Sequence, residues 1–129
     1  NPGVHKEGLM AGSANIHPDN MFNSPDGLAF DQDGRLWIQT DGNYGNSGDF
    51  AGMGNNQMLC ADPRSGEMRR FLVGPNGCEI TGITWSPDYR AMWVNVQHPG
   101  LSFPASDGQS RPRSSTVLIT KDDGGVIGS

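Results

Sequence analysis

The sequence predicts an all-β fold, a β-propeller fragment of about two antiparallel blades. The strand Gly27–Phe30 and the strand Leu36–Thr40 flank the turn signal Asp33-Gly34, as in a β-hairpin. The same layout returns about 55 residues later, with a first strand that ends at Trp85 and a second strand that contains Trp93. A hairpin repeated at this spacing is typical of propeller blades, which have four strands each.

The size and composition of the chain agree with part of such a fold. Its 129 residues include 19 glycines and 9 prolines, which suits many turns and short strands and disfavours long helices. A closed propeller needs at least about four blades, and this chain has material for about two. We therefore expect the chain to be part of a larger protein.

Four strands are expected in the first blade and three in the second. In order, they are Gly27–Phe30, Leu36–Thr40, Gln57–Ala61, Met68–Val73, Ile83–Trp85, Met92–Val96 and Thr116–Thr120. We expect another part of the parent protein to supply the fourth strand of the second blade. The predicted units are an N-terminal loop or insertion segment (1–22), a first blade (23–75), an incomplete second blade (76–120) and a C-terminal tail (121–129). Both ends, Asn1–Asn20 and Lys121–Ser129, are expected to be mobile.

The charge of the chain argues against one class of partner. Fourteen acidic and nine basic side chains give a net charge of −5, whereas a nucleic-acid-binding surface is basic. The acidic excess suits either simple solubility or carboxylates that bind hard cations such as calcium. The first 20 residues contain no membrane-spanning apolar run.

Loop lengths predict where function lies. Long loops follow the second strand of each blade, at Asp41–Asn56 and Gln97–Ser115, and such loops usually carry function. In an up-and-down blade these loops share one face with the connection Gly74–Thr81 and with the entry to the first strand, Asn23–Asp26. Five charged or titratable side chains are therefore expected on one rim: Asp26, Asp41, Asp49, Glu79 and His98.

Asp26 and Glu79 are the first candidates for metal ligands. Each precedes an innermost strand, and two carboxylates aimed at one channel repel unless a cation or a proton lies between them. Asp41 and His98 are second candidates. Other interpretations remain open, since Asp26 suits a turn cap, Glu79 a solvated loop and His98 a hydrogen-bonded loop position. The residues identify neither a catalytic side chain nor an organic cofactor.

The two cysteines, Cys60 and Cys78, leave several possibilities open. Cys60 falls in a predicted strand, where a small apolar side chain packs well. Cys78 adjoins Glu79 and suits a buried thiol, a metal ligand or half of a disulfide. Their separate predicted positions disfavour a disulfide between them.

Six longer strings go beyond a generic propeller. They are Asn23-Ser24-Pro25-Asp26-Gly27-Leu28, Arg35-Leu36-Trp37-Ile38-Gln39-Thr40-Asp41, Asn55-Asn56-Gln57-Met58-Leu59, Arg69-Arg70-Phe71-Leu72-Val73-Gly74-Pro75, Gly77-Cys78-Glu79-Ile80-Thr81-Gly82 and Val94-Asn95-Val96-Gln97-His98-Pro99-Gly100. Together they resemble the C-terminal part of the PhoX-type alkaline phosphatases, over roughly Met21 to Gly100.

The resemblance implies a six-bladed propeller that is exported to the periplasm. It also implies hydrolysis of phosphomonoesters at an iron–calcium cluster at the mouth of the channel. The family's cysteine ligand to iron and its phosphate-binding arginine are expected upstream of this chain. Neither role is assigned to Cys60, Cys78, Arg69 or Arg70.

Three functions follow from these observations. The first is part of a metal-dependent phosphatase, inactive as an isolated fragment and able to self-associate through exposed blade edges. The second is part of a calcium-dependent gluconolactonase-like propeller enzyme, a family that shares the Pro-Asp-Gly-Leu entry and the Leu-Trp-Ile strand. The third is a non-catalytic propeller that serves as a binding platform. The strings Gln97-His98-Pro99-Gly100 and Gly77-Cys78-Glu79 favour the phosphatase.

Overall fold

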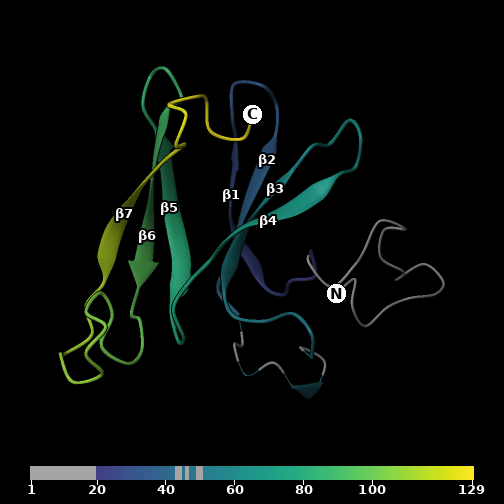
Figure 1. Ribbon diagram of the computed structural model, residues 1–129. Helices are drawn as coiled ribbons and strands as arrows, with labels where there is room; N and C mark the ends of the chain where they lie inside the picture. Colours follow the sequence, from purple (N-terminus) through teal and green to yellow (C-terminus); the bar gives the residue numbers. More distant parts are fainter. Residues whose placement is uncertain (1–19, 43–44, 46, 49–50) are drawn as a thin grey trace.

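The computed structural model describes residues 20–42, 45, 47–48 and 51–129, and its strands form two antiparallel sheets (Figure 1). The first sheet has the order β1-β2-β3-β4 and the second the order β5-β6-β7, so each is a simple meander. The strands are β1 (Pro25–Phe30), β2 (Leu36–Thr40), β3 (Gln57–Ala61), β4 (Met68–Val73), β5 (Glu79–Trp85), β6 (Ala91–Gln97) and β7 (Ser115–Thr120). The described residues contain no α-helix, and hence none long and apolar enough to cross a membrane.

Five of the seven strands match the predicted bounds to within one residue at each end, and the other two begin earlier than expected. β1 begins at Pro25, and β5 begins at Glu79 instead of Ile83. In β5 the register shifts between Thr81 and Thr84, and Gly82 adopts a φ of +56°, which glycine accepts without strain. This irregularity lets the strand extend through Gly82, which precedes the predicted beginning of the strand at Ile83. Glu79 therefore lies within a strand, not in the loop before it.

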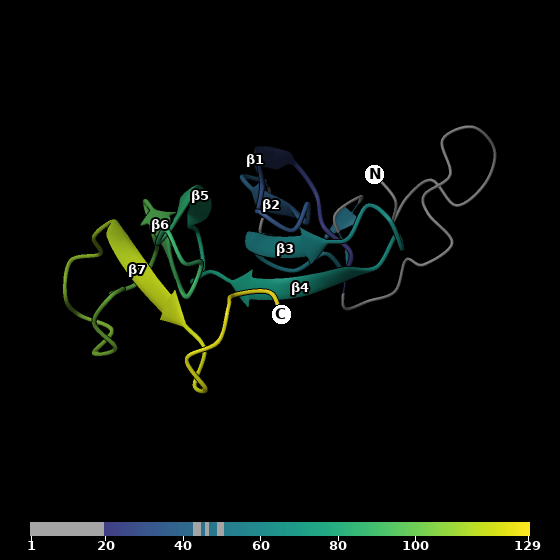
Figure 2. The same ribbon diagram turned by 90° about the horizontal axis from the view of Figure 1, so that it is seen from above.

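The core lies between the two sheets, which face each other (Figure 2). β5 is the strand of the second sheet that contacts the first sheet, at β1, β2 and β3. Trp37 of β2 is fully buried and meets Trp85 of β5 edge to face, with ring centroids 6.2 Å apart. Other buried apolar side chains complete this layer: Met58, Cys78, Ile80, Met92, Val94, Val96 and Ile127.

Equivalent positions in the two sheets confirm the sequence repeat. Phe30 pairs with Leu36 in the first sheet, and Trp85 pairs with Met92 in the second. A tryptophan directly follows the second residue of each pair: Trp37 follows Leu36, and Trp93 follows Met92. Adjacent residues of a strand point to opposite faces, so Phe30 lies on the face of its sheet away from Trp37. It is 63% exposed there, whereas its equivalent Trp85 packs against Trp37 of the first sheet.

The C-terminal segment, which was predicted to be mobile, packs against both sheets instead. It runs from β7 back across to the turn between β1 and β2 (Figure 1), and Ile127 is only 2% exposed. The backbone N–H of Ile127 donates to the carbonyl of Tyr89, and Arg35 donates to the carbonyl of Gly128 at 2.8 Å. One apolar side chain thus fills space between the sheets and orders the tail. At the other end, residues 1–19 lie outside the described residues, whereas Asn20 is buried and donates to the carbonyl of Met68.

Candidate metal centre

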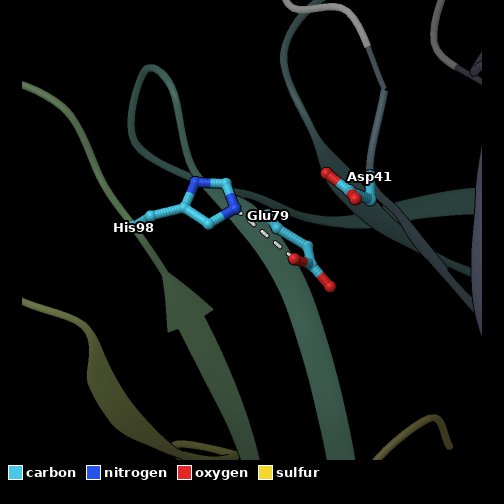
Figure 3. A group of neighbouring side chains, drawn as sticks. All are labelled: Asp41, Glu79 and His98. Carbon is cyan, nitrogen blue, oxygen red and sulfur yellow. Dashed lines mark ion pairs between the residues drawn. The ribbon is translucent and has the colours of Figure 1, made fainter.

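Three potential metal ligands converge from both sheets (Figure 3). Asp41 follows β2, Glu79 is the first residue of β5 and His98 follows β6. One ligand atom from each residue lies within 4.8 Å of the others. The three belong to the group that the loop lengths placed on one rim, so the structure brings these three predicted residues together.

Asp26, the remaining metal candidate, is not part of this group. It is exposed and lies where the β1–β2 register shifts between Pro25 and Gly27. The backbone nearby does approach the group, because the N–H of Asp41 donates to the carbonyl of Ser24 at 3.1 Å. Asp49, also predicted on the rim, lies outside the described residues.

The loop that precedes Glu79 is fixed by the loop that carries His98. Gly100 donates its backbone N–H to the carbonyl of Asn76 at 2.7 Å, and Nδ1 of His98 lies 3.2 Å from the carbonyl of Gly77. Gly100 is needed for this contact, because a Cβ at that position would lie 2.8 Å from the Asn76 oxygen. Glu79 and His98 are therefore held in one local unit.

The contact with Gly77 also selects one tautomer of the neutral His98 ring. A carbonyl oxygen can only accept a hydrogen bond, so Nδ1 carries the proton. In the neutral ring, Nε2 then presents its lone pair toward Oε2 of Glu79, 3.5 Å away. Metal-bound histidines commonly donate their other ring N–H to a backbone carbonyl in this way. A nitrogen lone pair that faces a carboxylate oxygen suits a cation shared between the two groups.

One of the three side chains is buried and two are exposed, which suits a site at the surface of the protein. Glu79 is 9% exposed, whereas Asp41 and His98 are open to solvent. A carboxylate with little access to water retains its charge best beside a positive group. The oxygen and imidazole donors of this set match those that calcium, iron and zinc accept in proteins. The residues therefore fit a metal ion at a site that is open to solvent on one side.

Neither cysteine belongs to this group. Both thiols are free, so Cys60 and Cys78 form no disulfide. Burial raises the pKa of each thiol to about 11, which disfavours the thiolate form that binds metals. Cys78 is fully buried in the core between the sheets, where a Cβ on Gly74 would collide with its sulfur.

The sequence did not single out Asn55 and Asn56 as functional, although both contact the segment before Glu79. Asn55 donates to the carbonyls of Gly74 and Pro75, and Asn56 donates to the carbonyl of Cys78. Adjacent asparagines at the start of a strand are a weak signal, because asparagine is common in loops.

Comparison with known proteins gives two matches. The family model described as alkaline phosphatase PhoX matches residues 1–100. The match therefore includes the first 20 residues, which the sequence resemblance had left out. A solved structure, Pseudomonas fluorescens PhoX in complex with vanadate, a transition state analogue, is 60% identical with a TM-score of 0.89. No curated protein matches.

The match to that structure is uneven in length. It covers 99% of this chain and 23% of the matched chain. The chain thus spans about a quarter of the length of the structure that it resembles.

Proposed function

Since this chain belongs to the PhoX family of alkaline phosphatases, we propose that it is the C-terminal part of a metal-dependent phosphomonoesterase. We propose further that residues 23–75 and 76–120 are neighbouring blades of a six-bladed propeller. The isolated chain is expected to be inactive, because most of the site would come from the rest of the parent protein.

The observation that carries this proposal is the convergence of Asp41, Glu79 and His98 from both sheets. These residues would hold part of a metal cluster, and we propose calcium and iron as its ions. Carboxylate oxygens suit calcium, and a mixed set of imidazole and carboxylate suits iron. We also propose Asp26 as a ligand, because the preceding backbone is hydrogen-bonded to Asp41.

Hydrolysis of a phosphomonoester requires stabilisation of the negative charge on its phosphoryl group. Bound metal ions would supply positive charge for the phosphoryl oxygens and would lower the pKa of a bound water. The part of this chain is to hold and orient the ligands: Nδ1 of His98 is tied to the Gly77 carbonyl, which leaves Nε2 free to bind. The vanadate complex of the Pseudomonas fluorescens protein supports a site suited to phosphoryl transfer, because a transition-state analogue binds where that charge is stabilised.

We also propose that the parent protein acts in the periplasm or outside the cell and that its substrates are phosphomonoesters, and the membership of the family supports this. A net charge of −5 does not suit nucleic acid as a partner. The family match favours the phosphatase over a gluconolactonase-like enzyme or a binding platform.

The test is hydrolysis of a chromogenic phosphomonoester by the full-length protein, before and after treatment with a chelator. We expect activity that the chelator abolishes and that calcium with iron restores. Hydrolysis of a lactone with no phosphatase activity would favour the gluconolactonase-like enzyme. Absence of both activities from a metal-loaded protein would favour the binding platform.

A further inference from the structure

The side chain of Asn56 links the segment that carries Asp41 to the segment that carries Glu79. Asn56 is 4% exposed and immediately precedes β3. Its Oδ1 accepts hydrogen bonds from the two residues that flank Asp41, namely from the Thr40 hydroxyl at 3.0 Å and from the Gly42 N–H at 2.7 Å.

The other end of the same amide reaches the segment that leads into the second sheet. Nδ2 of Asn56 donates to the carbonyl of Cys78 at 2.8 Å and to the carbonyl of Gly42 at 3.0 Å. Cys78 is the residue before Glu79. One buried side chain therefore holds the backbone beside both carboxylates of the candidate metal centre.

Asparagine suits this position better than other residue types. An amide offers two N–H donors and two acceptor lone pairs, and here all four are used. Aspartate has the same shape but no donor, so it would place an oxygen against the Gly42 and Cys78 carbonyls. Alanine would remove all four hydrogen bonds.

The rest of the segment before Glu79 is also held by hydrogen bonds to its backbone carbonyls. Each backbone carbonyl from residue 74 to residue 78 has a hydrogen-bond partner, supplied by Asn55, Gly100, His98 or Asn56. The last of these carbonyls, next to Glu79, is the one that Asn56 contacts. Among these contacts, the one from Asn56 also joins the residues that flank Asp41. It is therefore the contact that most directly links the position of Glu79 to that of Asp41.

We propose that Asn56 is a positioning residue that sets the separation of Asp41 and Glu79 and so preorganises the metal centre. This inference rests on the proposed function for its consequences in catalysis, whereas the hydrogen bonds that carry it are independent of that function. Partners that orient metal ligands commonly contribute 10- to 100-fold to metal affinity.

The experiment compares Asn56→Asp and Asn56→Ala with Gln32→Glu in the full-length protein. Gln32 is exposed in the turn between β1 and β2, so Gln32→Glu makes the same change from amide to carboxylate away from the centre. The first measurement is calcium binding to metal-free protein by calorimetry. We expect at least about tenfold weaker binding for Asn56→Asp and wild-type binding for Gln32→Glu.

A double-variant cycle shows whether Asn56 acts through Glu79. In a Glu79→Gln background, Asn56→Asp should weaken calcium binding much less than it does alone, because the ligand that it positions is already lost. Equal effects in both backgrounds would overturn the proposal. The split between kcat and KM adds a second readout, with the loss expected in kcat.

Hydrogen exchange in metal-free protein separates this inference from the proposed function. Peptides that cover residues 75–81 should exchange faster in Asn56→Asp than in Gln32→Glu, because the contact with Cys78 is lost. If the wild type binds no metal and has no phosphatase activity, the proposed function fails, while faster exchange still supports the link that Asn56 makes. Unchanged exchange and unchanged calcium affinity in Asn56→Asp would overturn the positioning role.

Discussion

The indole Nε1 of Trp37 donates a buried hydrogen bond to Oδ2 of Asp31, 2.9 Å away. The same carboxylate oxygen accepts from Nε of Arg35 at 2.7 Å. A turn residue of the first hairpin thus satisfies the only polar atom of the tryptophan that fills the core. Arg35 in turn donates to the carbonyls of Ile127 and Gly128, so this pair also joins the hairpin to the C-terminal segment.

Acid should destabilise the protein through Asp31. Burial alone would raise its pKa, but hydrogen bonds from Arg35 and Trp37 hold the pKa below the ordinary value of 3.8. A carboxyl whose pKa is lowered on folding stabilises the protein above its unfolded pKa, and that stability is lost as the pH falls through the folded pKa. We expect Asp31→Asn to lower the free energy of unfolding by about 2 kcal/mol at pH 7.

Urea unfolding of both proteins between pH 2 and pH 7 checks this. The difference between wild type and Asp31→Asn should be constant above about pH 5 and should shrink below about pH 4. A difference that does not change with pH would show that the charge of Asp31 contributes nothing.

Ile127 should contribute to stability as a core residue does. Ile127→Ala removes a nearly fully buried side chain from between the sheets and is expected to cost about 2–5 kcal/mol. Val126→Ala, at a partly exposed neighbour, is the matched control and should cost less. Urea unfolding followed by tryptophan fluorescence measures both, because Trp37 and Trp85 lie in the same core cluster. Equally small losses of unfolding free energy in both variants would mean that the packing of Ile127 does not stabilise the protein.

Both cysteines should resist alkylation in the folded protein. With a pKa of about 11, only about one thiol in a thousand is ionised at pH 8, and burial further limits access. We expect iodoacetamide to modify Cys60 and Cys78 slowly in native protein and completely in urea, as measured by peptide mass spectrometry. Rapid modification of Cys78 in native protein would indicate a reactive thiol at the rim and would reopen a role for it there.

The isolated chain should self-associate. Leu28 and Phe30 are 62% and 63% exposed on one face of the first sheet, and β7 ends the second sheet with one edge unpaired among the described residues. Exposed apolar faces and open strand edges favour association between copies. Light scattering of the 129-residue chain should show oligomers that Phe30→Lys reduces and that Gln32→Lys does not. A monomer at high concentration would contradict this.

Local sequence signals predicted most of the strands, because these strands have strong local causes. The bounds of β2, β3 and β4 follow from apolar runs between turn residues, and the structure has the same bounds. Two features depended on tertiary context. β5 continues through Gly82 because a register shift accommodates it, and the tail is ordered because Ile127 meets a core formed by residues far along the chain.

The sequence predicted which face of the fold carries the candidate site, but not which side chains come together there. Loop lengths placed Asp41, Glu79 and His98 on one face, and the structure brings them within 4.8 Å. Their places before innermost strands made Asp26 and Glu79 the first candidates, but Asp26 lies at an irregularity of the β1–β2 register and outside that group. The role of Asn56 depends on four hydrogen bonds to residues between 14 and 22 positions away, with no local pattern to reveal them.

The metal ligands provide the last prediction. Asp41→Asn, Glu79→Gln and His98→Gln in the full-length protein should each lower bound calcium or iron and the phosphatase rate together, at least about tenfold. We expect the same direction for Asp26→Asn, with a smaller effect because Asp26 lies outside the group of three. Glu67→Gln is the control, because Glu67 is an exposed carboxylate paired with Arg69 outside the group.

Thermal melting of the metal-free variants distinguishes a ligand from a structural residue. None of the four side chains belongs to the apolar core, so metal-free melting temperatures should stay near that of wild type. Near-normal activity and metal content in both Asp26→Asn and Glu79→Gln would overturn the assignment. A large fall in melting temperature with metal retained would instead make the altered side chain a structural residue, because its loss would then act on the folded chain and not on the ions.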